Sequence, residues 1–447
     1  MATSVEADIQ HTTGEGAVVN SDISTRMAAL VDRHQDMVRC PFPLFDDLRA
    51  ADPVHYSEAL GAWVLTRYDD CLAVLHDPVR WSTRMHTGPK PLNEVLGRRM
   101  EELSATPEGA ALVTESTAVI ARGPVLASAD PPVHVRQRKL VNGAFRPSRL
   151  RAMEPLVQEV ADALIDAFAQ RGSVELVQEF AVGLPMAIIA NALGVGDEDL
   201  ETFKRWSDDM VMPVGNQSPS LHQVRGYLES HRDFSAYFNA KIDERRHQPA
   251  DDVISDIANA EIEGETLERR EQLSIISQLL TAGNETTTKL ITAIARYLAE
   301  YPDVQARVRA DRGLVPALVE EVVRLEAPVG GLFRQATTDI EVGGITIPAG
   351  DHVWVLYSSA NRDHERFGCP ADFDIDRPDL KDHVGFGHGQ HYCLGAGLAR
   401  LEATVGTNAL LDRLDAIVLA GANDFTFEDS YLLRGLRELH LEFTPLG

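Results

Sequence analysis

Cysteine is scarce in this chain, and long uncharged apolar runs are missing from it. The four cysteines among 447 residues include no C-x-x-C pair, which argues against a zinc ribbon, a thioredoxin-type motif or a disulfide scaffold. The first ten residues carry acidic groups instead of an apolar core, and no run of about eighteen apolar residues occurs. We therefore expect a cytoplasmic protein without a signal peptide or a membrane-spanning helix.

Positive charge is also in short supply. Lys and Arg number 42 against 68 Asp and Glu, so the formal net charge is −26. A fold this acidic is a poor binder of nucleic acid and is repelled by anionic membranes. A local basic patch for an acidic protein partner remains compatible with this balance.

The hydrophobic pattern predicts one mainly α-helical domain with small β-sheets, an α+β class. Residues 1–24 are rich in Ser, Thr and acidic groups and predict a flexible tail. No linker or repeat divides residues 25–447, which we expect to form a single domain. The pattern predicts a β-hairpin at 54–67, loops with short helices at 82–129, helices at 148–171, 174–247, 315–326 and 396–413, and short strands at 340–342, 345–347 and 352–356.

The longest predicted helix runs from about Leu267 to Glu300, with Thr266 as a possible N-cap and Pro302 as its limit. At 1.5 Å per residue it would span roughly 50 Å. Its centre, residues 283–288, is rich in poor helix formers, Gly and Thr among them. A helix weakened at its centre indicates either a functional site or close packing against a neighbour at Gly283, and both interpretations stay open here.

The segment HVGFGHGQHYCLGAGLARLE, residues 383–402, places Cys393 after a glycine-rich turn and before a helix. Backbone N–H groups of such a turn and of a helix N-terminus favour an anionic sulfur. Small residues also let a flat, bulky group approach the backbone. The pattern favours a thiolate that binds a metal or acts as a nucleophile, whereas a buried, inert thiol is the better interpretation of the other three cysteines.

Residues 386–395, FGHGQHYCLG, resemble the haem-binding signature of the cytochrome P450 superfamily, F-x-x-G-x-H/R-x-C-x-G. The resemblance implies a cytochrome P450 fold with a long central helix over the haem, and Cys393 as the axial thiolate of haem b. It also assigns Phe386, Gly387 and Gly395 to the cofactor-binding loop. A thiolate ligand donates electron density to the iron and favours O–O cleavage.

The centre of the long helix, AGNETT at 282–287, is similar to the family's oxygen-activation motif. The resemblance implies that Ala282 and Gly283 leave room for dioxygen above the iron. Thr286 would donate a hydrogen bond to iron-bound oxygen, and Glu285 would pass protons inward from water. The alternative is a threonine cluster that hydrogen-bonds to its own helix.

Two further sets of residues match family positions. Glu321 and Arg324 form E-x-x-R on one helix face and would join Arg377 in a buried structural network. The cationic or donor groups expected at the haem propionates are His134, Arg138, Arg334 and His391. The alternative for each is an ordinary surface charge.

The leading functional hypothesis is a soluble bacterial-type monooxygenase that inserts one oxygen atom of O₂ into an apolar substrate by hydroxylation. The resemblance implies a monomer that receives electrons from a separate ferredoxin and an NAD(P)H-dependent ferredoxin reductase. We expect an acidic ferredoxin to dock on a basic island near the cysteine, formed by Arg136, Lys139, Arg146 and Arg400.

By family analogy, the substrate pocket includes Leu279, Val329, Gly330, Leu332 and Leu432. These residues are apolar or small, which favours a terpenoid, steroid, fatty acid or aromatic compound. Arg84, His86 and Lys90 are candidates for a substrate carboxylate, with solvated loop charges as the alternative. Other functions left open are a peroxide-driven peroxygenase, a haem-thiolate isomerase, a non-catalytic haem sensor, and a cysteine hydrolase that uses Cys393 with His391.

Overall fold

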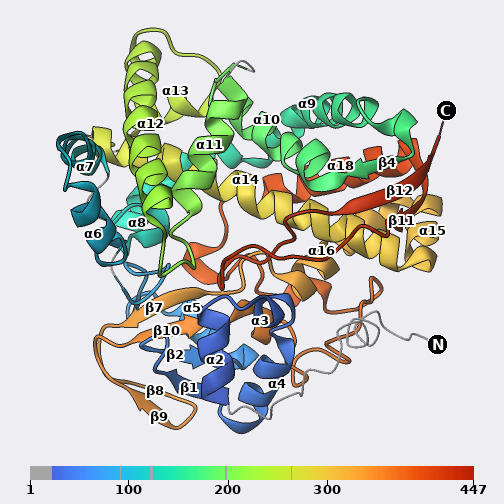
Figure 1. The fold of residues 1–447 in the computed structure, drawn as a ribbon, viewed down its shortest axis with the longest axis horizontal. Coiled ribbons are helices and arrows are strands. Elements are labelled where there is room, and N and C mark those ends of the chain that lie inside the picture. Colours follow the sequence, from blue (N-terminus) through green and yellow to red (C-terminus); the bar gives the residue numbers. More distant parts are fainter. Residues whose placement is uncertain (1–22, 91, 121–123, 197–198, 263, 447) are drawn as a thin grey trace.

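In the computed structural model of the chain, residues 23–90, 92–120, 124–196, 199–262 and 264–446 are described. Of the expected tail, residues 1–22 lie outside these ranges, and the first described helix begins at Ile23. Helices dominate and small sheets lie beside them (Figure 1), so the predicted fold class is confirmed. Within the described ranges, no helix is both long and apolar enough to cross a bilayer.

The α-helices include those that the sequence predicted from residue 148 onward, together with others, such as α2 to α5, that it did not predict. They are α2 (Ile23–Val31), α3 (Gln35–Arg39), α4 (Phe42–Ala51), α5 (Tyr68–His76), α6 (Leu92–Leu103), α7 (Pro107–Val119), α8 (Val133–Val141), α9 (Pro147–Asp166), α10 (Gly183–Ala192), α11 (Leu200–Val211), α12 (Leu221–His247), α13 (Val253–Ala258), α14 (Arg269–Glu300), α15 (Pro302–Ala310), α16 (Val315–Glu326), α17 (Tyr357–Ala360) and α18 (Ala396–Arg413).

The strands form small sheets. They are β1 (Val54–Ser57), β2 (Ala62–Leu65), β3 (Trp81–Ser82), β4 (Ser173–Glu175), β5 (Glu261–Ile262), β6 (Glu265–Thr266), β7 (Leu332–Ala336), β8 (Ile340–Val342), β9 (Ile345–Ile347), β10 (His352–Val355), β11 (Leu414–Leu419) and β12 (His440–Pro445). The largest sheet has the order β1-β2-β10-β7-β3, and β1 and β2 form the predicted antiparallel hairpin. The pairing of β10 with β2 is parallel, so this sheet joins distant parts of the chain.

Two local predictions differ from the structure. Residues 82–129 contain the full helices α6 and α7 in addition to loops. The N-cap of α7 is Thr106, whose side chain accepts a hydrogen bond from Gly109 N at 3.1 Å, and Pro107 occupies the first turn. The cap of α14 is Glu268 and not Thr266, because Thr266 pairs with Glu261 in a β-ladder before the helix starts.

Helix α14 is the central element. It crosses the middle of the molecule, with α9 to α13 and α18 on one side and the five-stranded sheet with α2 and α4 on the other (Figure 1). Leu290, Ile291 and Ile294 of α14 are nearly fully buried in the largest apolar cluster. Burial of each such side chain contributes about 1.5–3 kcal/mol, so the helix is held by its apolar contacts even though its centre is rich in Gly and Thr.

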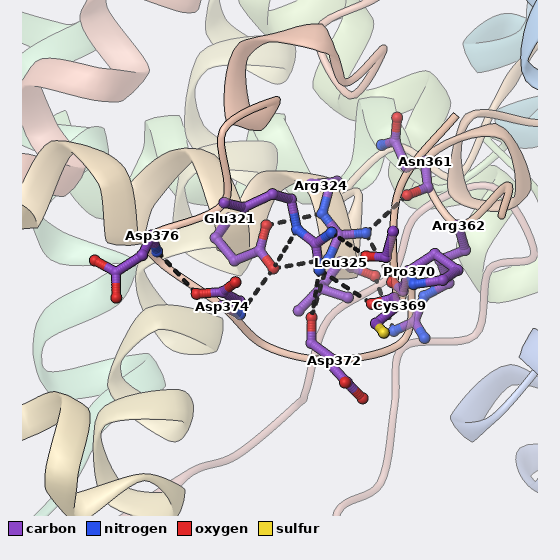
Figure 2. A network of polar contacts seen from close by, with 12 residues as sticks. Glu321, Arg324, Leu325, Asn361, Arg362, Cys369, Pro370, Asp372, Asp374 and Asp376 are labelled. Carbon is purple, nitrogen blue, oxygen red and sulfur yellow. Dashed lines mark hydrogen bonds and ion pairs between the residues drawn. The ribbon is translucent and has the colours of Figure 1, made fainter. Parts of the chain in front are cut away.

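A buried ionic network connects α16 to the irregular segment that follows α17 (Figure 2). Arg324 donates to both carboxylate oxygens of Glu321, at 2.7 and 2.8 Å, and both side chains are fully buried. Arg377 Nε lies 3.4 Å from Glu321 Oε1 and also donates to main-chain carbonyls, including that of Cys369 at 3.0 Å. The structure thus brings together the three residues that the sequence analysis grouped.

The network extends toward the cysteine loop. Arg324 donates to the carbonyl of Asn361 at 2.8 Å, and the side chain of Asn361 accepts from Val384 N at 2.7 Å. Val384 stands nine residues before Cys393 in the same loop. The Glu321–Arg324 pair therefore fixes, through Asn361, the backbone position of Val384 at the beginning of the cysteine loop.

We expect Arg377→Met to destabilise the fold by about 3 kcal/mol, because it removes a buried charge from its partner and leaves several carbonyls without a donor. Urea unfolding measures the loss. Arg307→Met is the matched control, since Arg307 pairs with Asp376 on the surface, where such a pair contributes at most about 1 kcal/mol. Equal losses in the two variants would contradict the structural role of the network.

Candidate active site

The loop before α18 holds Cys393 through its glycines and a backbone hydrogen bond. Gly387 and Gly389 have φ of +68° and +67°, a region that side chains rarely adopt. A Cβ on Gly389 would stand 2.5 Å from the carbonyl oxygen of Leu75, so the loop packs directly on the end of α5. Cys393 N donates to Phe386 O at 2.9 Å and closes the loop.

The Cys393 sulfur lies where backbone and side-chain charges favour an anion. Burial among protein atoms raises the pKa of this thiol overall, although the N–H groups of Gly395 and Ala396 and the positive charges of Arg138 and Arg400 act to lower it. The residue nevertheless keeps solvent-accessible surface. Donors aimed at an accessible sulfur fit a thiolate that binds a metal.

Cys71 is the opposite case. It is fully buried, its Sγ donates to Leu65 O at 3.3 Å, and burial raises the pKa of its thiol strongly. It behaves as a small apolar side chain, as expected from the sequence. Cys40 and Cys369, for which a buried thiol was also expected, are exposed instead.

The acids of α16 also hold this loop. Glu320 accepts from Arg400 of α18 and lies 3.0 Å from His383 Nε2. Arg400 in turn donates to the hydroxyl of Tyr392 at 3.0 Å and lies over the ring of Phe386. Arg400 is therefore part of the internal support of the cysteine loop.

The residues expected to contact propionates gather in one basic cluster. His134 and Arg138 come from α8, Arg334 from β7 and His391 from the cysteine loop, and the rings of His134 and His391 lie 4.0 Å apart. His86 joins them, because its charge is among the causes that lower the pKa of His391. The sequence analysis had named His86 as a candidate for a substrate carboxylate, and the structure instead places it beside Arg334 and His391. The pairing of β3 with β7 carries its segment to Arg334.

The basic cluster has few anionic partners within the protein. Burial, followed by the charges of His134, Arg334, His86 and Arg138, lowers the pKa of His391 to about 2. Burial and the charge of Arg334 lower the pKa of His86 to about 4. Among the described residues, His391 Nε2 and His86 Nδ1 have no hydrogen-bond partner, and the buried Arg334 makes no ion pair. A group with two carboxylates fits this cluster, as the propionates of a haem would.

The centre of α14 is accessible on one side. Ala282 is exposed and Gly283 half-buried, although Leu280 and Asn284 on either side are buried. A Cβ on Gly283 would meet Ile189 at an ordinary 3.7 Å, so packing against α10 does not require glycine there. Leu279 of α14 and Leu394 of the cysteine loop pack against the same apolar cluster, which places the helix centre near the thiol loop.

The Thr286 hydroxyl donates to Ala282 O of its own helix at 2.7 Å. This is the intrahelical hydrogen bond that the sequence analysis considered as the alternative. Donation to another oxygen therefore requires the hydroxyl hydrogen to turn away from Ala282. In the present geometry the Thr286 oxygen is available as an acceptor.

Glu285 stands in a cluster of charges, of which those on α14 are largely buried and those on α11 are partly exposed. Its Oε2 lies 3.0 Å from Lys289 Nζ, and its Oε1 lies 3.8 Å from Lys204 Nζ of α11. Burial raises the pKa of Glu285, but the two ammonium groups outweigh it and lower the pKa overall. Asp208 of α11 lies beside them, and burial raises its pKa to about 6 despite Lys204, with Glu285 acting in the same direction as burial.

Near pH 6 and below, the proton shared in this cluster therefore resides on Asp208 while Glu285 is ionised. The sequence analysis did not single out Asp208, Lys204 or Lys289. Their only signal was the i,i+4 spacing of Lys204 with Asp208 and of Glu285 with Lys289.

Four of the expected pocket residues lie together. Val329 pairs with Leu433 in an isolated β-bridge, Gly330 N donates to Leu432 O at 2.7 Å, and Leu332 begins β7. Gly330 and Leu432 border a cavity of about 30 Å³, which admits water only. Leu279 lies apart from them on α14, against a different apolar cluster.

His391 is not arranged as a base for Cys393. Its ring stacks on His134, and no hydrogen bond joins it to the thiol in the part of the chain that the structure describes. A cysteine hydrolase needs that contact.

The comparisons with known proteins agree on one family. The model of the family described as "Cytochrome P450" matches residues 80–434. The chain is 32% identical to vitamin D(3) 25-hydroxylase of Pseudonocardia autotrophica, over 91% of this chain and 94% of that protein. Its structure is similar to that of a cytochrome P450 from Chondromyces apiculatus, with a TM-score of 0.79 and 36% identity, covering 93% and 98% of the two chains. It is also similar to a Bacillus megaterium cytochrome P450 in complex with testosterone, with a TM-score of 0.76 and 30% identity over 90% and 99% of the chains.

Glu402, on the helix that follows Cys393, provides a pH-dependent test of this region. It is 2% exposed, and its Oε2 has no partner among the described residues. Burial raises its pKa to about 8. Because the folded state then binds a proton that the unfolded state has lost, stability must fall as pH rises from about 5 to about 8.

We expect Glu402→Gln to abolish this fall, which amounts to about 1.4 kcal/mol per pH unit. Urea unfolding at several pH values measures it, and the exposed Glu341→Gln serves as the control that keeps the wild-type profile. A wild-type profile in the Glu402 variant would show that this carboxyl ionises normally.

Proposed function

The chain belongs to the cytochrome P450 family, and from that premise we propose that Cys393 is the axial ligand of haem b in a monooxygenase that hydroxylates an apolar organic substrate. Its enzyme class is that of the cytochrome P450 monooxygenases. The observation that carries the ligand assignment is the exposed Cys393, whose thiol is approached by two backbone N–H groups and lies in the field of two arginines. When bound, a haem-thiolate supplies the means to activate dioxygen.

The basic cluster would hold the cofactor. His134, Arg138, Arg334 and His391 would contact the propionates, since these cations and donors, buried or half-buried, form no ion pair with a carboxylate among the described residues. Phe386, Gly387 and Gly395 shape the loop that presents the sulfur, and Glu321, Arg324 and Arg377 support that loop from α16.

Proton supply would depend on α11 and α14. Asp208 carries a proton in a fraction of the molecules near neutral pH, and the ionised Glu285 beside it can accept that proton, after which Asp208 regains one from solvent. Glu285 then passes the proton toward Thr286, whose oxygen is free to accept a hydrogen bond. Ala282 and Gly283, which carry little side chain, keep this face of the helix open.

The acid–alcohol pair favours oxygen-dependent chemistry over a peroxide-driven reaction or a non-catalytic sensor, neither of which needs it. For the substrate we propose a terpenoid, steroid, fatty acid or aromatic compound, contacted by Leu279, Val329, Gly330, Leu332 and Leu432. Two relatives support this class by their names, a vitamin D(3) hydroxylase and a protein in complex with testosterone.

The function is tested by turnover with ¹⁸O₂, a ferredoxin, its reductase, NAD(P)H and a panel of such compounds. We expect a product that carries one labelled oxygen atom, formed from compounds that also shift the haem spectrum from low to high spin. Cys393→Ala should abolish both the product and the absorption maximum of sulfur-ligated ferrous haem under carbon monoxide. Unlabelled product, or turnover by the alanine variant, would overturn the proposal.

We further propose that electrons arrive from an acidic ferredoxin that docks beside the cysteine loop. Val135 of α8 and Tyr392 are 40% and 38% exposed, and the carbonyl of Tyr392 accepts from Arg138 of α8. Two apolar side chains therefore lie on one face, and Lys139 and Arg146 nearby are exposed and make no ion pair among the described residues. An apolar centre with a cationic rim is the usual form of such an interface.

The structure refines the expected basic island. Arg136 pairs with Glu271, and Arg400 pairs with Glu320. Their charges are neutralised inside the protein, so the docking role falls mainly on Lys139 and Arg146.

We expect Lys139→Glu with Arg146→Glu to slow the first electron transfer about tenfold at low salt, with a smaller effect at high salt because exposed charges are then screened. Stopped-flow reduction by ferredoxin measures the rate. Lys381→Glu, the reversal of another exposed cation that belongs to neither α8 nor the segment joining α8 to α9, is the control. An unchanged rate in the double variant at low salt would refute this docking face.

Three proposals concern the whole chain. Residues 25–447 form a single domain, the protein is a monomer, and it works in the cytoplasm. Four free cysteines fit a reducing compartment.

A further inference from the structure

We propose that Lys289 is a positioning residue that holds the Glu285 carboxylate in place for proton transfer. The inference rests on the role proposed above for Glu285, and it assigns a function to a buried cation that no motif includes. Lys289 is three residues after Thr286 and four after Glu285, so it lies one helical turn beyond the acid.

The geometry commits Lys289 to Glu285. Its Nζ lies 3.0 Å from Glu285 Oε2, and the Lys289 side chain is only 5% exposed. The other carboxylate oxygen, Oε1, faces Lys204 at 3.8 Å and Asn284 Nδ2 at 3.4 Å. Lys289 therefore holds Oε2 of Glu285, and Oε1 remains available to accept the proton of Asp208.

Gly435 fixes the stem of Lys289 from the opposite side. A Cβ on Gly435 would lie 2.3 Å from Lys289 Cγ and 2.9 Å from its Cδ. The φ of Gly435 is not in the left-handed region, so its backbone conformation does not require glycine. The absence of a side chain at position 435 is needed because the lysine stem fills that space.

The charges that face Glu285 come from three elements. Lys204 and Asp208 belong to α11, Lys289 to α14, and Glu428 to the C-terminal segment that packs on Lys289. Burial lowers the pKa of Lys289, but Glu285 and Glu428 raise it overall, so the side chain keeps its charge. Lys204 is partly exposed and interacts with Glu285 from farther away, which makes Lys289 the closer and less screened of the two cations.

Without Lys289, the carboxylate loses its closest cation and is free to turn. Its affinity for a proton rises, and below neutral pH it becomes protonated and unable to accept the proton of Asp208. The acid limb of the pH profile, where turnover falls as the pH is lowered, should then move to higher pH. More of the NAD(P)H electrons should reduce oxygen without forming product.

The first experiment uses Lys289→Met, which keeps the stem and removes the charge. We expect the fraction of NAD(P)H electrons recovered in product to fall about tenfold, and the acid limb to move up by about one pH unit. Lys289→Arg should restore most of both values. Lys241→Met removes a lysine that pairs with Glu244 near the surface and should leave both values unchanged.

The second experiment needs no turnover. Lys289→Met and Glu285→Gln should each lower the thermal unfolding midpoint by several degrees, and the double variant should fall no further than the worse single variant, because each single change leaves a buried charge without its partner. Additive losses would show that the two side chains are not coupled and would overturn the inference.

Gly435→Ala tests the position of the lysine while keeping its charge. The new methyl group must displace the Lys289 stem. We therefore expect the fraction of electrons recovered in product to fall and the acid limb of the turnover profile to move to higher pH, as in Lys289→Met. This test stands even if Lys289→Met folds poorly. If Lys289→Met and Gly435→Ala both recover the normal fraction of NAD(P)H electrons in product while Glu285→Gln does not, the role of Lys289 is overturned and the proton route is not. If Glu285→Gln also recovers the normal fraction of electrons in product, the proposed proton route itself is overturned.

Discussion

The fully buried contact between Glu321 and Arg324 determines how the remainder of the site is placed. Both side chains lie on one face of α16, and neither reaches solvent. Because a buried charge is costly without a partner, the two residues must meet, and the remaining donors of Arg324 must find acceptors. Those acceptors are carbonyls of the irregular segment from Asn361 to Asp372 (Figure 2). One ion pair therefore holds a segment with little regular structure in a single conformation.

Two neighbouring acids of α16 support different parts of the chain around the cysteine. Glu321 holds the segment before the cysteine loop, and Glu320 binds His383 at the beginning of that loop and Arg400 on the helix after it. Gly385 lies so close to α16 that a Cβ would stand 2.7 Å from the Val323 side chain. The thiol is thus presented by a loop whose two ends are attached to the same helix, which is the kind of rigid support that a metal ligand needs.

Charge is distributed unevenly in this strongly acidic protein. The anions lie mostly on the surface, whereas the cation Arg334 lies with His86, His134 and His391, whose pKa values burial lowers, in a group without matching carboxylates. Between α11 and α14 the opposite arrangement holds, with Glu285 and Asp208 balanced by Lys204 and Lys289. The first cluster suits the binding of an anionic group, and the second suits the storage and transfer of a proton.

The sequence alone determined the elements and motifs that depend on neighbours along the chain. The hairpin at β1 and β2, the long helix, the turn around Cys393 and the pair Glu321–Arg324 all follow from periodicity, turn chemistry or spacing within a few residues. The helix α7 could have been predicted from Thr106 and Pro107 in the same way. Tertiary structure alone decided which distant groups meet: His86 with Arg334, Asp208 with Glu285, and Gly435 with the stem of Lys289. These contacts join segments far apart in the chain, and only the packing of helices and strands sets the distances, the burial and hence the charge states on which the chemistry depends.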